Sequence, residues 1–330
     1  MPYTPKSTYK PLETPQSWPD HYSEEDIANA VKVIDWLNEK QVPISHLSTL
    51  ARVDKSMTYR TIHGQYKSPP TGHLTKLLST IAHQDRQHSV REVPFVESTV
   101  SKLAFAACKR ARTYKSFAIL SAFVGTGKTR SLKEYQRQYP NTYLIEADPG
   151  MSVQALLDAL VRQIGCDVKK SAPQHTKYTA IIDELTGTDT LLIIDEAETL
   201  TPKALHNLRR IRDKAGIGIV LAGTEGLNAL IKPVRGEFDQ IRSRTNFWPS
   251  TAHGITRDDA VMAIEAAFAD RTDLTDDVTE RLWRYCGGSM RMLVEDLIPA
   301  LRDFGLAKHD LSVALVDNVA LKVLNLQKPD

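Results

Sequence analysis

The sequence predicts an α/β protein whose core is a parallel β-sheet flanked by helices, with a helical unit before this core and an all-α region after it. The apolar stretch FAIL at 117–120 runs into a glycine-bearing loop that closes on GKT at 127–129. A second apolar stretch, TLLIIDE at 190–196, ends in two carboxylates. Further apolar stretches of strand length alternate with helical patterns, which is the order that a parallel sheet requires.

The first stretch and its loop predict a nucleotide-binding site. A strand, a loop that ends in GKT and a helix expected at 130–138 form the context of a phosphate-binding loop. Backbone N–H groups of the loop and the positive end of the helix suit a phosphate group. Lys128 is expected to reach the β- and γ-phosphate oxygens, and the Thr129 hydroxyl to help hold Mg²⁺. The residues expected to contact the nucleotide here are Val124, Gly125, Thr126, Gly127, Lys128, Thr129 and Arg130.

The loop departs from the usual pattern at one position. Ala122 stands where a first glycine is common, so the motif is AxxGxGKT rather than GxxxxGKT. Alanine keeps the loop conformation only if its φ angle is negative.

The second stretch predicts the catalytic carboxylates. Parallel strands place Asp195 and Glu196 at the carboxyl edge of the sheet, close to the phosphate loop. Asp195 is expected to hold Mg²⁺, directly or through water, and Glu196 to polarise the attacking water. The alternative is a buried strand that ends in solvated acids, and the nearby Lys128 and Thr129 weigh against it.

Length and charge predict several domains and a polyanionic partner. A chain of 330 residues exceeds one average domain, and its 42% hydrophobic and 25% charged residues are ordinary for a globular protein. The net charge of +2 conceals an uneven distribution. Residues 44–91 hold seven Lys/Arg against two acids, whereas residues 255–330 hold nine against fourteen. One end of the chain is therefore expected to face a polyanion.

Cysteine usage and hydropathy predict a soluble, cytoplasmic protein with no membrane partner. Cys108, Cys166 and Cys286 are far apart and lack metal-ligand spacing, so we expect reduced thiols. The N-terminus has no apolar signal core, and no stretch approaches 18 consecutive apolar residues.

The N-terminal part predicts an arm and a helix-turn-helix domain. Residues 1–22 hold five prolines and are expected to form an extended arm, either an inert tail or a partner-binding segment. Ser23 precedes a helical pattern that ends near Asn38. Three shorter patterns follow at 44–51, 54–63 and 71–83, and they resemble a repressor-type helix-turn-helix unit, with Arg52 in place of the turn glycine.

Several polar side chains of the helix predicted at 54–63 are candidates for contact with bases or phosphates: Lys55, Ser56, Thr58, Tyr59 and Arg60. Phosphate contacts give affinity without specificity, so only a weak sequence preference is expected. The alternative is a small helical bundle that contacts proteins.

The core is expected to follow a polar hinge. A helix opens at Pro94 and runs to about Arg112, and Phe95 and Val96 either pack against an adenine ring or belong to the ordinary core. Further strands are predicted at 143–147, 217–222 and 245–249, and further helices at 152–164, 178–185 and 201–214. Thr224 follows the strand at 217–222, where a polar residue could sense a γ-phosphate.

The C-terminal part predicts an all-α lid. Helical patterns occupy 256–269, 275–286, 290–304 and 311–324. Arg291 at a helix start opposes the helix dipole, which favours a position facing a phosphate. Arg244 lies just before an edge strand and is either an arginine finger for a neighbouring subunit or a surface residue. The predicted divisions are an arm at 1–22, a helix-turn-helix domain at 23–83, a linker at 84–93, a nucleotide-binding core at 94–254 and a helical lid at 255–330.

These motifs together resemble those of an AAA+ ATPase. The segments AFVGTGKT at 122–129, LLIIDEAE at 191–198, LAGT at 221–224, Ser243-Arg244 and GGSMR at 287–291 match its phosphate loop, acidic strand, first sensor, arginine finger and second sensor in order and spacing. The whole chain, including PFVEST at 94–99, is similar to the MuB/TnsC/TniB family of transposition regulators.

This resemblance implies an ATP-dependent, sequence-nonspecific DNA-binding ATPase that forms filaments or rings on duplex DNA with ATP between subunits. It implies Mg²⁺ as a cofactor, and as partners a transposase that is recruited to target sites, a target-selector protein and further copies of the chain. Lys128, Glu196 and Arg244 would be catalytic, with Thr224 on the γ-phosphate. Core residues that could contact DNA are Lys109, Arg110, Arg112, Lys115 and Lys203.

Three alternatives remain open on the sequence. One is a replication initiator or loader ATPase, which shares the fold class. Another is a transcriptional regulator in which nucleotide gates the helix-turn-helix. The third is a nucleotide-binding scaffold with negligible turnover, against which the Asp195–Glu196 pair argues.

Overall fold

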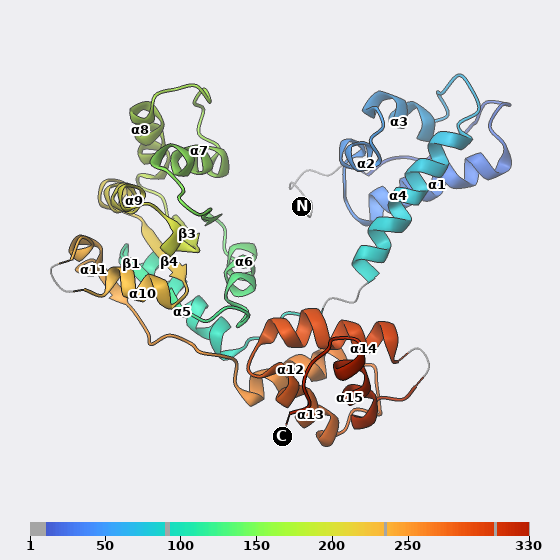
Figure 1. The fold of residues 1–330 in the computed structure, drawn as a ribbon. Coiled ribbons are helices and arrows are strands. Elements are labelled where there is room, and N and C mark those ends of the chain that lie inside the picture. Colours follow the sequence, from blue (N-terminus) through green and yellow to red (C-terminus); the bar gives the residue numbers. More distant parts are fainter. Residues whose placement is uncertain (1–10, 90–92, 234–235, 307–308, 330) are drawn as a thin grey trace. The chain divides into compact units, whose positions relative to one another are not determined.

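The computed structural model describes residues 11–89, 93–233, 236–306 and 309–329. The chain divides into two compact units, one up to Glu92 and one from Val93 onward (Figure 1). Each unit is described by itself.

The first unit is a bundle of four helices. Its elements are α1 Glu24–Glu39, α2 Ile44–Ala51, α3 Lys55–Ile62 and α4 Thr71–Ser89. Ser23 and Asp26 form a capping box at the start of α1. The apolar faces of the helices enclose a small core that includes Ile34, Leu47, Ile62 and Leu77.

Helix α4 corrects the predicted hinge. It continues to Ser89, six residues beyond the predicted end, so most of the predicted linker at 84–93 is helical and residues 90–92 lie outside the described part. The segment QDRQHS is polar but contains no glycine or proline, and polarity alone does not end a helix.

The structure around the turn between α2 and α3 shows how Arg52 replaces the turn glycine and excludes Thr58 as a candidate for contact with nucleic acid. Arg52 adopts a left-handed conformation (φ 51°, ψ 50°) where glycine would be expected. Thr58 is buried, and its Oγ1 donates to the Asp54 carbonyl and contacts Ser48 Oγ at 3.0 Å. Thr58 therefore belongs to the core of the bundle and is not a surface residue available to nucleic acid.

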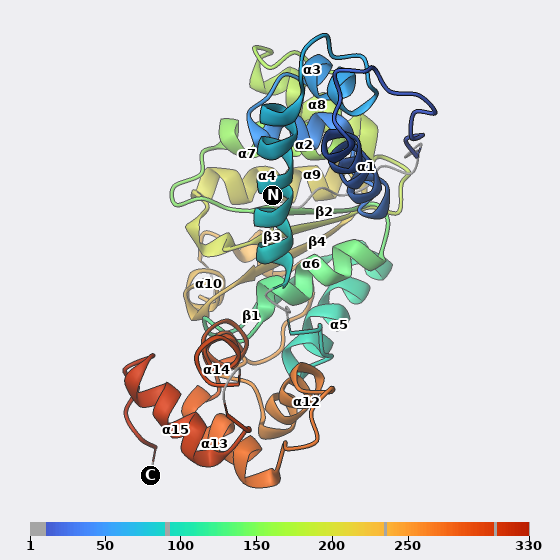
Figure 2. The same ribbon diagram turned by 90° about the vertical axis from the view of Figure 1, so that its right-hand side faces the viewer.

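The second unit is built on a five-stranded parallel sheet, as the sequence predicts. Its strands lie in the order β2-β3-β4-β1-β5. Figure 2 shows β2, β3 and β4 side by side. The central strands β1, β3 and β4 are buried along their whole length, which is typical of a sheet covered on both faces. The strand bounds are β1 Phe117–Ser121, β2 Thr142–Glu146, β3 Leu191–Asp195, β4 Gly218–Gly223 and β5 Thr245–Phe247.

Helices cover both faces of this sheet. Helices α5 Thr99–Tyr114 and α6 Lys128–Gln138 pack on one face. The other face is covered by α7 Val153–Ile164, α8 Gln174–Leu185, α9 Pro202–Ala215 and α10 Glu225–Ile231, with the short α11 Asp239–Arg242 after them. Gly218 permits close approach of α5, because an added Cβ would lie 2.3 Å from the Ala111 carbonyl oxygen.

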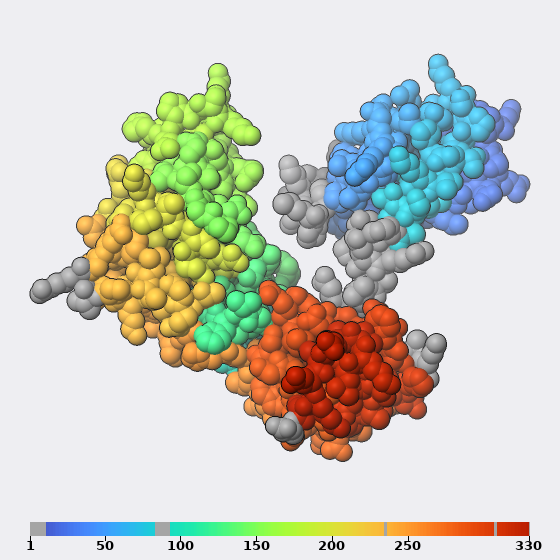
Figure 3. All heavy atoms as spheres, in the orientation of Figure 1, coloured from blue at the N-terminus to red at the C-terminus, as the bar shows by residue number. Residues whose placement is uncertain are grey.

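The C-terminal helices enclose a separate hydrophobic core. The atoms of these helices are orange to red in Figure 3. The helices are α12 Arg257–Ala267, α13 Asp276–Cys286, the π-helical turn η2 Met292–Leu297, α14 Ile298–Phe304 and α15 Val313–Lys322. The single helix predicted at 290–304 is thus interrupted by η2. Pro299 lacks an N–H and its ring would clash with the carbonyl four residues earlier, and a π-turn before it relieves this conflict.

The described cysteines carry free thiols, as predicted. Burial raises the pKa of the Cys108 thiol. No helix in the described ranges has the length and apolarity needed to cross a bilayer.

Candidate nucleotide site

The phosphate loop connects β1 to α6 in the predicted conformation. Ala122 forms an extended parallel bridge with Ala252, and its φ is not positive, so alanine fits the position of the missing glycine. Gly125 and Gly127 have φ angles of +82° and +90°. These values favour glycine, and they turn the chain into α6, which begins at Lys128 without a side-chain cap.

Three predicted residues meet at the carboxyl edge of the sheet. Lys128 Nζ lies 2.9 Å from Asp195 Oδ1, and Thr129 Oγ1 donates to Asp195 Oδ2 at 2.6 Å. The Glu196 backbone N–H also donates to Oδ1 at 3.0 Å. The Asp195 side chain is only 1% exposed and that of Lys128 10%, so the buried carboxylate is fully compensated. The side-chain oxygens of Thr129 and Asp195 are ligands of the kind that Mg²⁺ prefers, and the uncapped α6 suits phosphate.

Glu196 has a different environment from Asp195. Its backbone is left-handed (φ 54°, ψ 37°) and its side chain is exposed. The 3₁₀ turn η1 Ala197–Thr199 follows directly. Glu196 is thus a solvent-accessible carboxylate beside the buried one.

The structure adds Glu198, which the sequence analysis did not select. It lies on η1 and accepts hydrogen bonds from the Thr224 N–H at 2.9 Å and the Thr224 hydroxyl at 2.7 Å. Thr224 also caps α10 by accepting from the Gly226 N–H at 3.3 Å. The only sequence signal for this contact is a third acid, two residues after Glu196.

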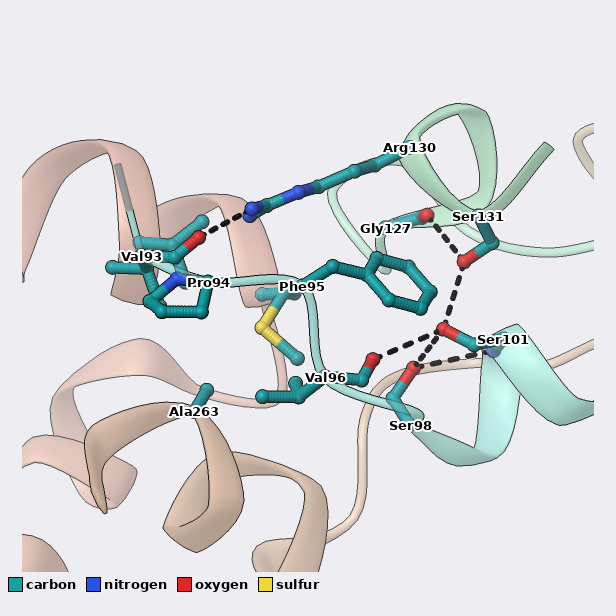
Figure 4. A pocket seen from close by; sticks show the side chains of 12 residues that line it. Val93, Pro94, Phe95, Val96, Ser98, Ser101, Gly127, Arg130, Ser131 and Ala263 are labelled. Atoms are coloured by element: carbon teal, nitrogen blue, oxygen red, sulfur yellow. Dashed lines mark hydrogen bonds between the residues drawn. The ribbon is translucent and has the colours of Figure 1, made fainter. Parts of the chain in front are cut away.

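A pocket lies where residues 93–98, the entry segment, pass α6 and the C-terminal helices. Helix α5 begins at Thr99 with Ser98 as its N-cap, so the predicted start at Pro94 is wrong and residues 93–98 are irregular. A side-chain cap at Ser98 satisfies the first N–H groups and fixes the start there. Phe95 and Val96 line this pocket (Figure 4).

Polar contacts join the walls of this pocket. Arg130 reaches from α6 and donates to the Val93 carbonyl (Figure 4). Ser101 and Ser131 share a hydrogen bond of 2.9 Å, and Ser131 donates to the Gly127 carbonyl at 2.9 Å. The pocket therefore borders the phosphate loop.

The two arginines that the sequence places near phosphate, Arg291 and Arg244, have different partners in the structure. The Arg291 N–H donates to the Gly125 carbonyl at 2.9 Å, and its exposed side chain pairs with Glu295. Arg244 Nε lies 3.0 Å from Asp213 Oδ1, and its Nη1 donates to the Gln240 carbonyl at 2.9 Å. Asp213 also pairs with Arg212.

The predicted DNA-contacting residues fall into two groups. Arg112 and Lys115 both pair with Asp189, and Arg112 also donates to the Pro140 carbonyl. These two side chains are thus occupied within the fold. The remaining members are exposed: Lys109, Arg110 and Lys203 in the second unit, and Lys55, Ser56, Tyr59 and Arg60 on α3.

Comparisons with known proteins identify relatives. A family model described as an AAA domain matches residues 111–231. The chain is 25% identical over 279 residues to the Mu-like prophage FluMu DNA transposition protein B of Haemophilus influenzae, a match that covers 80% of this chain and 93% of that protein. It is 32% identical to the ATP-dependent target DNA activator B of Escherichia phage Mu over 42% of this chain and 46% of that protein.

Among solved structures, the Aeropyrum pernix Orc1 protein in complex with DNA matches with a TM-score of 0.49 and 15% identity, over 70% of this chain and 67% of that one. The transposition proteins match the family that the sequence motifs resemble, and the AAA domain spans the phosphate loop and the acidic strand. Residues 111–231 therefore match an AAA domain, and the chain is similar to the Mu-type transposition B proteins.

Proposed function

We propose that this protein is an Mg²⁺-dependent ATPase that assembles on duplex DNA without sequence preference and activates that DNA as a target for a transposase. The observation that carries the proposal is the buried cluster of Lys128, Thr129 and Asp195 at the carboxyl edge of the sheet. The names of the relatives, a transposition protein and an ATP-dependent target DNA activator, supply the biological setting.

In this proposal the nucleotide phosphates lie against the loop from Val124 to Arg130. Lys128 would exchange its contact with Asp195 for phosphate oxygens, and Thr129 and Asp195 would hold Mg²⁺. Bound Mg²⁺ supplies charge neutralisation and polarises the phosphate oxygens. Glu196, the exposed carboxylate next to Asp195, would orient and deprotonate the attacking water.

The base of the nucleotide would occupy the pocket beside the entry segment. Phe95 and Val96 offer an apolar surface there, and Gly127 and Arg130 continue the lining into the phosphate loop. Arg291 would approach the phosphates from the C-terminal helices, since its N–H already contacts the Gly125 carbonyl.

Assembly would bring Arg244 to the nucleotide of a neighbouring copy. Its guanidinium is paired with Asp213 within the chain, so a neighbour's phosphate must replace that carboxylate. Such an arginine stabilises charge that develops during phosphoryl transfer.

DNA would be bound through the exposed basic side chains of the two units. The exposed candidates are Lys55, Ser56, Tyr59 and Arg60 on α3, in the helices that we interpret as a helix-turn-helix, and the core residues Lys109, Arg110 and Lys203. A transposase and a target-selector protein are the proposed protein partners.

Electron microscopy on random-sequence duplex DNA tests the proposal. Filaments or rings are expected with Mg²⁺ and ATP but not with ADP, and Glu196→Gln should preserve them while slowing hydrolysis by about 10²-fold or more. Lys128→Ala should abolish them. Discrete particles that do not change when DNA or nucleotide is added would contradict the proposal and favour a nucleotide-gated regulator.

A further inference from the structure

Glu198 holds Thr224, the residue that the resemblance to AAA+ ATPases places on the γ-phosphate. Its Oε1 accepts both the N–H of Thr224, at 2.9 Å, and the hydroxyl proton of Thr224, at 2.7 Å. The turn η1 that carries Glu198 packs against β4 and α10, so the carboxylate is fixed at the carboxyl end of β4. The contact is charge-assisted and is therefore stronger than a neutral hydrogen bond.

The chain provides a dedicated space for this carboxylate. A Cβ added at Gly223 would lie 2.0 Å from Glu198 Oε2. Oε2 is buried and, within the described part of the chain, receives no hydrogen bond. A buried carboxylate oxygen without a donor costs free energy, and a neutral side chain such as glutamine would tether Thr224 at a smaller cost. Holding Thr224 in place therefore does not by itself explain why this residue is charged.

The hydrogen-bond inventory of Thr224 supplies one. A threonine hydroxyl has a single proton, and here Glu198 receives it. The lone pairs of the same hydroxyl face the Gly226 N–H. A phosphate oxygen can only accept a hydrogen bond. The Thr224 hydroxyl can therefore donate to a γ-phosphate only after it stops donating to Glu198.

We propose that Glu198 is a specificity-determining residue that masks Thr224 and thereby limits the preference of this site for ATP over ADP. This inference rests on the proposed function, because it assumes that Thr224 faces the γ-phosphate. ADP has no γ-phosphate, so its affinity does not depend on the hydrogen bond between Thr224 and Glu198. For ATP, this hydrogen bond must break before Thr224 can contact the γ-phosphate, and the free energy required lowers the affinity for ATP.

The test is the ratio of the dissociation constants of ADP and of the β,γ-imido analogue of ATP, measured with Mg²⁺ on the full chain. Glu198→Gln keeps the shape and removes the charge, so the ratio should shift towards the ATP analogue by about five-fold or more. Glu198→Ala should shift it in the same direction. Glu225→Gln, an exposed carboxylate next to Thr224, is the matched control and should leave the ratio unchanged.

A double-mutant cycle separates masking from a general charge effect. In a Thr224→Val background, Glu198→Gln should no longer change the ratio. An unchanged or reduced preference for the ATP analogue in Glu198→Gln, with ADP affinity retained, overturns the inference and leaves the proposed function standing. Failure of the unmodified chain to bind either nucleotide would overturn both.

Discussion

Lys128 and Asp195 in the nucleotide site are buried and bonded to each other, whereas Lys55 and Arg60 on α3 are exposed. Both regions are proposed to contact phosphate. In the first, the side chains are fixed by partners before any ligand arrives, so each one also contributes to stability. In the second, the charges extend into solvent and contribute little to folding.

This difference teaches how each region should respond to substitution. A pre-organised site loses binding and stability together when one member is removed. An exposed basic face loses affinity in small, salt-dependent steps while the fold is unaffected. The following predictions test that contrast.

The largest effect is expected for Lys128→Ala. It removes a phosphate ligand and leaves the buried Asp195 carboxylate without its cation, so nucleotide binding should be lost and the free energy of unfolding should fall by about 3 kcal/mol. Nucleotide titration and chemical denaturation measure the two effects. Lys133→Ala, on the same helix but 60% exposed, is the control and should change neither. Normal stability in Lys128→Ala would show that the buried pair contributes nothing to folding.

A smaller effect is expected for Thr58→Val in the first unit. The substitution removes the hydroxyl that contacts Ser48 and the Asp54 carbonyl inside the bundle, so that unit should lose about 1 kcal/mol of stability. Hydrogen exchange of the α1–α4 amides reports it. Thr49→Val, an exposed threonine on α2, should have little effect. Equal losses for both variants would contradict the placement of Thr58 in the core.

The exposed face of α3 should respond only in DNA binding. Lys55→Ala and Arg60→Ala should each weaken binding to duplex DNA for every sequence tested, and each should lower the slope of log K against log salt by roughly 1. Stability should not change. Lys32→Ala, an exposed lysine on α1, is the comparison. A slope that none of the α3 variants alters would assign DNA binding to the core residues instead.

The smallest effect concerns an exposed ion pair on α6. Hydrogen bonds from Arg137, and then Gln138, hold the pKa of Glu134 at about 2, well below its usual 4.5. Because the folded-state pKa is depressed, the stabilisation is present above pH 4.5 and is lost as the pH falls toward 2.

Glu134→Gln should therefore cost about 0.5 kcal/mol at pH 7, since Arg137 is largely exposed and solvent screens the pair. The cost should vanish near pH 2, as denaturation at the two pH values can show. Glu146→Gln, whose only ion pair is a 4.0 Å contact with Lys133 in the described structure, should show no pH-dependent difference. A loss at pH 7 as large as that of Lys128→Ala would remove the distinction between buried and exposed pairs.

The fold was predictable because its signals are local. Apolar stretches with helical patterns between them predicted the strands within a few residues, and the helix predicted at 201–214 matches α9 Pro202–Ala215. The misplaced ends had competing local causes. Ser98 started α5 later than Pro94 suggested, α4 continued through a polar segment, and Pro299 introduced a π-turn.

The candidate site was predictable only in part. Lys128 and Thr129 were selected from the GKT motif and Asp195 from its place at the end of a neighbouring parallel strand, and the structure brings the three together. Glu198 was not selected, because its contact with Thr224 joins two segments 26 residues apart. Arg112 was taken for a surface cation, and only the approach of Asp189 and Pro140 accounts for it.

The sequence by itself determined which segments become strands and helices, where the phosphate loop lies and which acids end the neighbouring strand, because these properties follow from periodicity, caps and turns. Tertiary structure decided which polar groups are occupied. Contacts between separate segments place Thr58 beside Ser48, pair Arg244 with Asp213 and direct the hydrogen bond of the Thr224 hydroxyl to Glu198. Such pairings depend on distances across the fold that no local pattern encodes.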